Sequence, residues 1–136
     1  RSDFVSIHVP LSPDTRHLIG PAQLAAMRPT AVLVNTSRGP VVDQQALYQA
    51  LKAGRLFAAA LDVTEVEPIP MDDPLLTLSN VIIPPHIASA SVATRTKMAV
   101  MAAANLIAGI NGQPLPYCVN PEALKQRPPA REKEGQ

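Results

Sequence analysis

Residues 32–43, "VLVNTSRGPVVD", join a short apolar segment directly to a polar turn. The valines and leucine are typical of a buried β-strand, and the polar turn that follows carries Asn35, Arg38 and Gly39. Asp43 then stands where a helix would need its N-cap. The stretch therefore predicts a strand, a turn that presents an arginine, and the start of a helix, which together are typical of an α/β fold.

The same alternation extends in both directions along the chain. Apolar segments predict strands at residues 4–9, 31–35, 56–61 and 81–83. Helical spacing predicts helices at residues 21–27, 44–53 and 92–110. Gly54 and Gly112 stand where the second and third helices should end. This order predicts one sheet of parallel strands, and the lack of alternation within the strands indicates helices on both faces.

Composition excludes several classes of function. The 136 residues carry a net charge of +1 and 3% aromatic side chains, which argues against a nucleic-acid-binding protein. The longest apolar run, at residues 99–104, is too short to span a membrane. Cys118 is the single cysteine and cannot form an internal disulfide. We therefore expect a cytoplasmic protein whose partners include no nucleic acid and no membrane.

Chemically active residues follow the predicted strands. Arg38 comes after the second strand, and Asp62 and Glu67 come after the third. His86 comes after the fourth. Because the carboxyl ends of parallel strands lie at one edge of a sheet, where ligands bind in open α/β folds, we expect these side chains to converge on one site.

These residue types suit the reduction of a small 2-oxo acid. The guanidinium of Arg38 can bind a carboxylate through two parallel hydrogen bonds. A histidine titrates near neutral pH, so His86 can give a proton to a carbonyl oxygen. Glu67 beside it would favour the protonated ring and fix its orientation. The hydride must come from a cofactor, and the sequence carries no flavin or metal signature.

Three segments carry a family resemblance: "NTSRGPVVD", "ALDVTEVEP" and "PPHIAS". In this order they resemble the hallmark segments of the D-2-hydroxyacid dehydrogenases, and "DFVSIHVPLSPDTRHLI" resembles a cofactor-lining segment of that family. The resemblance covers residues 3–116 and implies a partial Rossmann-type parallel sheet with helices on both faces. Within the family, "DDPLLTLSNVIIPPHIAS" and "MAAANLIAGINGQPLP" look most like glyoxylate/hydroxypyruvate reductases.

The resemblance implies a role for each motif residue. Arg38 would orient the carboxylate and carbonyl of a small 2-oxo acid, Glu67 would assist, and His86 would be the acid/base. Asp62 would face the nicotinamide carboxamide. The residues that would line the cofactor, NAD or NADP, are Pro10, Thr36, Asp62 and Ser89. We expect the complete protein to be a homodimer.

The resemblance also divides the chain into three parts. Residues 1–112 would be the C-terminal part of the dinucleotide-binding domain, ending in a long helix whose alanines, placed almost all round, predict heavy burial. Residues 113–121 would be a linker that returns towards the absent substrate domain. Residues 122–136, charged and nearly free of apolar side chains, would be a disordered tail.

The sequence also departs from the family pattern. No G-x-G-x-x-G turn occurs, so the cradle for the cofactor's pyrophosphate, and the residue that separates NAD from NADP, are not in this chain. We therefore expect the C-terminal part of a longer protein, inactive when alone.

Other polar residues have simpler interpretations. His8 is interpreted as packing within its strand and His17 as a solvated loop residue, and the histidines and the cysteine have no metal-ligand spacing. Glu65 competes with Glu67 for the carboxylate role, but the proline that follows Glu67 favours the latter and leaves Glu65 exposed. Asp72 or Asp73 would cap the turn "PLLTL".

Two hypotheses about function remain. The first is an oxidoreductase that transfers a hydride between NAD(P)H and a small 2-oxo or 2-hydroxy acid. The alternative is a dinucleotide-sensing binding protein of the corepressor type on the same scaffold, since fold alone does not decide function. Turnover by the complete protein, and its loss in variants of Arg38 and His86, would discriminate between them.

Overall fold

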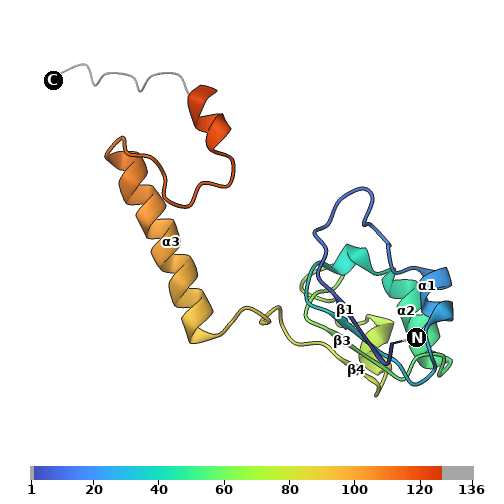
Figure 1. The fold of residues 1–136 in the computed structure, drawn as a ribbon. Helices are drawn as coiled ribbons and strands as arrows, with labels where there is room; N and C mark the ends of the chain where they lie inside the picture. The colour runs from blue at the N-terminus through green and yellow to red at the C-terminus, as the bar shows by residue number, and fades with distance from the viewer. Residues whose placement is uncertain (1, 127–136) are drawn as a thin grey trace. The chain divides into compact units, whose positions relative to one another are not determined.

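The computed structural model describes residues 2–126, and the chain divides into two compact units, Arg1–Ser89 and Ala90–Gln136 (Figure 1). The long helix belongs to the second unit, where it packs with the segment that follows it. The division at residue 112, which refers to the dinucleotide-binding domain of a longer protein, stays a prediction. Residues 127–136, which make up most of the predicted disordered tail, lie outside the described residues.

A sheet of four parallel strands organises the described part of the first unit. In spatial order the strands are β1 (Phe4–Ile7), β2 (Val32–Asn35), β3 (Ala58–Leu61) and β4 (Val81–Ile82). Ile7 lies opposite Asn35, and Asn35 lies opposite Leu61, so these three strands end level with one another. The predicted parallel sheet is confirmed, and the residues that follow each strand leave it at the same edge.

The helices of this unit begin and end close to where the sequence predicted. They are α1 (Pro21–Ala26) and α2 (Gln44–Lys52). Asp43 caps α2, because its carboxylate accepts a hydrogen bond from the Ala46 N–H at 2.8 Å. Gly54 follows α2 with a φ of 65°, a left-handed conformation that glycine adopts freely. The sequence did not predict the short 3-10 helices η1 (Gly39–Val41) and η2 (Pro74–Thr77).

The hydrophobic core lies against one face of the sheet. Leu33 and Leu61 point from β2 and β3 towards Leu24 of α1 and Leu47 of α2, and all four side chains are buried. Burial of a leucine side chain contributes about 1.5–3 kcal/mol to the free energy of folding. The helices therefore fix the strands, and the strands fix the turns at their carboxyl ends.

The opposite face of the sheet is more open. Phe4 of β1 and Ile82 of β4 are 72% and 70% exposed, and the small side chains of Ala58 and Ala60 on β3 are half-buried. We expected helices on both faces. Among residues 2–89, α1 and α2 share the core face.

The second unit contains α3 (Val92–Ile110), which begins at the predicted residue. Ser91 caps it by accepting a hydrogen bond from the Thr94 N–H at 3.1 Å, and Gly112 follows it with a φ of 67°. The predicted heavy burial is wrong for this unit, because Ala108 is the buried residue of α3 in the described chain. Alanine on every face makes burial possible but does not supply a partner.

The predicted linker folds back along α3. The side chain of Asn105 donates a hydrogen bond to the carbonyl oxygen of Tyr117 at 3.2 Å and accepts one from the Tyr117 N–H at 3.0 Å. A short 3-10 helix, η3 (Pro121–Gln126), covers the first residues of the predicted tail. No helix in the described residues is long and apolar enough to cross a membrane.

Candidate active site

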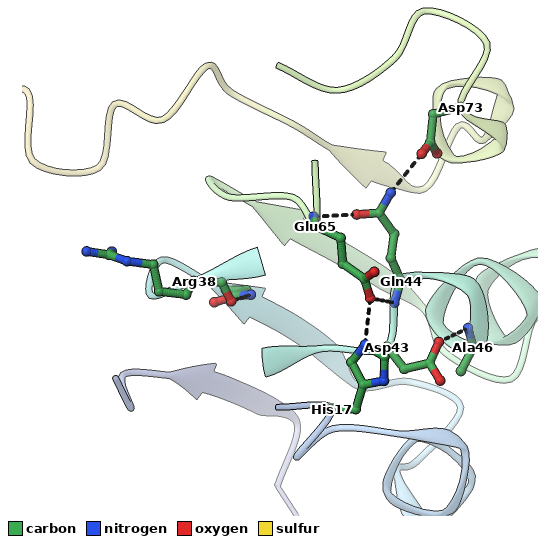
Figure 2. A network of polar contacts seen from close by, with 8 residues as sticks. His17, Arg38, Asp43, Gln44, Ala46, Glu65 and Asp73 are labelled. Atoms are coloured by element: carbon green, nitrogen blue, oxygen red, sulfur yellow. Dashed lines mark hydrogen bonds and ion pairs between the residues drawn. The ribbon is translucent and has the colours of Figure 1, made fainter. Parts of the chain in front are cut away.

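The turn after β2 is held by a buried asparagine. Asn35 is inaccessible, and its side-chain oxygen accepts hydrogen bonds from both the N–H and the hydroxyl of Ser37, each at 3.0 Å. Its side-chain nitrogen donates to the carbonyl oxygen of Arg38 at 3.0 Å. The backbone of the turn is therefore fixed, and the exposed Arg38 side chain projects away from the neighbouring polar network (Figure 2).

Gly39 brings this turn against the loop that follows β3. A Cβ atom at Gly39 would lie 1.9 Å from the carbonyl oxygen of Thr64, so only glycine allows the approach. Thr64 lies between Asp62 and Glu67 in the sequence. The turn that carries Arg38 and the loop that carries the carboxylates are therefore in direct backbone contact.

Glu67 and His86 form a hydrogen-bonded pair, as the sequence predicted. His86 Nδ1 lies 2.8 Å from Glu67 Oε2, and the other carboxylate oxygen accepts a hydrogen bond from the Thr64 N–H at 3.1 Å. The side chains of His86 and Glu67 are 51% and 38% exposed, so both are accessible to a ligand. His86 Nε2 has no hydrogen-bond partner in the described residues, so it is the ring nitrogen that can exchange a proton with a substrate.

Asp62 contacts the loop that carries His86. It is buried, and its two oxygens accept hydrogen bonds from the N–H groups of Ile87 at 2.7 Å and Ala88 at 2.9 Å. His86 itself has a φ of 52°, in the left-handed region that residues other than glycine enter at a cost of about 1–3 kcal/mol.

Two hollows contain most of the predicted site residues. The first has a volume of about 520 Å³ and is lined by His8, Val9, Pro10, Leu11, Thr36, Ser37 and Arg38. The second, of about 320 Å³, is more apolar, and its lining includes Asp62, Glu67, Pro84 and His86. Both lie at the carboxyl edge of the sheet, because their lining residues follow the strands.

The structure therefore brings together most of the predicted residues in two groups. Pro10, Thr36 and Arg38 share the first hollow, and among the described residues no hydrogen bond or ion pair joins Arg38 to His86. The guanidinium of Arg38 instead donates to the carbonyl oxygen of Ser37 at 2.7 Å. Ser89 is exposed and lines neither of these hollows.

A polar network beside the site was missed in the sequence. His17 Nε2 lies 2.9 Å from Glu65 Oε1, which also accepts the Gln44 N–H at 3.1 Å (Figure 2). The Gln44 side chain accepts the Glu65 N–H at 2.9 Å and donates to Asp73 at 2.7 Å. Asp73 also caps η2, as expected of Asp72 or Asp73.

The network corrects two interpretations. Glu65, expected to be exposed, is half-buried and makes three hydrogen bonds with two residues, His17 and Gln44, so His17 is paired to it rather than simply solvated. The interpretation of His8 as strand packing is also wrong. His8 is exposed, lines the first hollow and lies 2.7 Å from Ser6 Oγ. The placement of Ser6 and His8 two residues apart, on one face of an extended chain, was the available signal.

No group of three or more histidine, cysteine, aspartate or glutamate side chains in residues 2–126 is arranged to hold a metal ion. The parallel sheet, the arginine turn and the histidine–carboxylate pair at the carboxyl edge define an α/β domain of the Rossmann type with a polar edge site. The chain belongs to the D-isomer specific 2-hydroxyacid dehydrogenases, whose NAD binding domain model matches residues 1–88. The family expected from the sequence is confirmed.

This chain spans less than half the length of the relatives it matches. It is 61% identical over 128 residues to a glyoxylate reductase of Korarchaeum cryptofilum, covering 94% of this chain and 39% of that protein. The crystal structure of the TT0316 protein from Thermus thermophilus aligns with a TM-score of 0.83 and 47% identity, covering 87% and 38% of the two chains. An NADPH-dependent glyoxylate/hydroxypyruvate reductase of Sinorhizobium meliloti, solved with NADP and malonate, aligns with a TM-score of 0.73 and 40% identity, covering 78% and 33%.

Proposed function

We propose that the complete protein carrying this chain reduces a small 2-oxo acid, glyoxylate or hydroxypyruvate first of all, with NADH or NADPH. The observation that carries the proposal is the hydrogen-bonded pair of Glu67 and His86 at the carboxyl edge of the sheet. The backbone of the loop that carries Glu67 contacts the turn that carries Arg38. The names of the Korarchaeum and Sinorhizobium relatives support the choice of substrate.

Three residues of this chain have different roles in the proposed carbonyl reduction. The exposed guanidinium of Arg38 binds the carboxylate of the 2-oxo acid through parallel hydrogen bonds. His86 gives the proton on Nε2 to the carbonyl oxygen, which becomes a hydroxyl group. Glu67, at 2.8 Å from Nδ1, orients the ring and stabilises its positive charge before the transfer. The hydride that the carbonyl carbon receives would come from a bound nicotinamide cofactor.

The first hollow fits part of such a cofactor. It lies where open α/β sheets bind dinucleotides, has a volume of about 520 Å³, and its lining includes Pro10, Thr36 and Ser37. Thr36 and Pro10 would hold the cofactor from this side, and Ser89 remains a proposed contact. This sequence contains no glycine-rich cradle for the pyrophosphate.

The test is the rate of NADPH and NADH oxidation by the complete protein, offered glyoxylate, hydroxypyruvate and pyruvate separately. We expect turnover with glyoxylate or hydroxypyruvate, and a loss of about a hundredfold or more in Arg38→Gln and His86→Ala. Arg55→Gln is the matched control, because Arg55 is also exposed but precedes β3 at the opposite edge of the sheet.

Each negative result has its own meaning. Full activity in both site variants would overturn the residue assignment. Dinucleotide binding without turnover of any 2-oxo acid would favour the binding protein of the corepressor type. The single cysteine leads us to propose a cytoplasmic protein, and the family resemblance leads us to propose a homodimer. Light scattering on the purified complete protein would refute the homodimer if it gave the mass of one subunit.

A further inference from the structure

The loop that carries His86 is tied to the end of β3 by one buried carboxylate. Asp62 follows β3 directly, and its side chain accepts hydrogen bonds from the N–H groups of Ile87 and Ala88, at 2.7 and 2.9 Å. Ile87 and Ala88 are the two residues after His86, and both are exposed. Asp62 is only 6% exposed, so water offers little competition for these bonds.

The position of these bonds matters because of the backbone at His86. Its φ of 52° lies in the left-handed region, which a residue with a Cβ atom enters only when its surroundings hold it there. The preceding strand, β4, contains two residues and gives little support. Asp62 stabilises this backbone conformation from the C-terminal side of His86, because it accepts hydrogen bonds from both N–H groups that follow the histidine.

We propose that Asp62 is a positioning residue for His86. It holds the backbone of His86 while Glu67 holds the ring, and both carboxylates come from the same loop after β3. The family resemblance instead implied that Asp62 contacts the nicotinamide carboxamide. In this structure each carboxylate oxygen accepts one backbone N–H of the histidine loop, so this loop is the partner that the geometry shows, and the carboxamide contact is the alternative that the Kd measurement tests. The kinetic consequence of this role rests on the proposed function.

Asparagine is the informative replacement for Asp62. It has the same shape but keeps only one of the two oxygens. Because Ile87 and Ala88 bond different oxygens of Asp62, one of their N–H groups would face the NH₂ donor. Asp72→Asn is the matched control, because Asp72 is exposed and has no side-chain hydrogen bond in the described residues.

The first measurement is amide hydrogen exchange by NMR on the 136-residue chain. In the unmodified chain, the amides of Ile87 and Ala88 should exchange more slowly than that of Ser89, although all three residues are exposed. In Asp62→Asn they should exchange about tenfold faster, with no change in Asp72→Asn. Equal exchange at the three amides of the unmodified chain would overturn the proposal even if the variant fails to fold.

The second measurement is on the complete protein with glyoxylate. We expect Asp62→Asn to lower kcat about tenfold to a hundredfold, while Kd for NADPH and NADH stays within about twofold. A weaker Kd with unchanged kcat would overturn the proposal and restore the carboxamide role. Slow exchange at Ile87 and Ala88 in a protein that turns over no 2-oxo acid would support the tether and refute the proposed function, so the two failures differ.

Discussion

At the scale of single residues, Gly39 decides whether the two halves of the site can meet. Its Cα lies so close to the Thr64 carbonyl that a Cβ atom would overlap with the backbone, which cannot rotate away as a side chain can. We expect Gly39→Ala to lower the free energy of unfolding by about 3 kcal/mol. Urea denaturation of the chain, followed by circular dichroism, measures the change.

Gly54 provides the control for this prediction. It has a positive φ, but no atom lies within 4 Å of the point that a Cβ atom would occupy, so Gly54→Ala adds conformational cost without a collision. Its expected loss is about 1 kcal/mol. Equal losses in the two variants would mean that the contact with Thr64 is unimportant.

At the scale of elements, Gln44 connects the start of α2 to two loops. Its side chain accepts the Glu65 N–H and donates to Asp73, which caps η2. We expect Gln44→Ala to lower the free energy of unfolding by about 1–2 kcal/mol, since two half-buried hydrogen bonds are lost. Gln45→Ala, at the exposed next position of α2, should change it by less than about 0.5 kcal/mol. A loss in Gln45→Ala as large as in Gln44→Ala would contradict this role.

Elements were predictable where their signals are local. The Asp43 cap, the Gly54 stop and the apolar run of β2 each depend on neighbours in sequence, and the structure confirms all three. Gln44 was missed because its partners are 21 and 29 residues away, and no spacing rule links a polar side chain to such partners. The pairing of Glu67 with His86 was predictable only because parallel strands send both loops to one edge.

At the scale of the whole molecule, we expect the chain to hold only part of a site. It spans 39% of the length of the Korarchaeum relative, and its sequence contains no glycine-rich cradle for a pyrophosphate. We expect the 136-residue chain alone to show no NADPH oxidation with glyoxylate, because the cofactor would be held from one side only. An absorbance assay at high protein concentration checks this, with the complete protein as the positive control. Turnover by the chain alone would refute it.

The same scale shows what the sequence could not supply. The parallel sheet follows from the order of the segments, but the amount of burial on α3 and on the second sheet face does not. An alanine-rich helix and a strand without alternation both indicate that a surface is able to be covered. What covers α3 and the second face of the sheet depends on contacts between segments far apart in the sequence, which local sequence patterns do not predict.

The short loop after β3 has a consequence for how this protein can be altered by evolution or by engineering. Asp62, at the start of the loop, accepts hydrogen bonds from the backbone just after His86. Glu67, further along the same loop, is hydrogen-bonded to the His86 ring. The number of residues between Asp62 and Glu67 therefore decides whether both carboxylates reach the His86 segment at once. Side chains between Asp62 and Glu67 are free to vary within the limits of packing. An inserted or deleted residue would move one of the two carboxylates away from its hydrogen-bond partner. Length, more than composition, is what this loop must preserve.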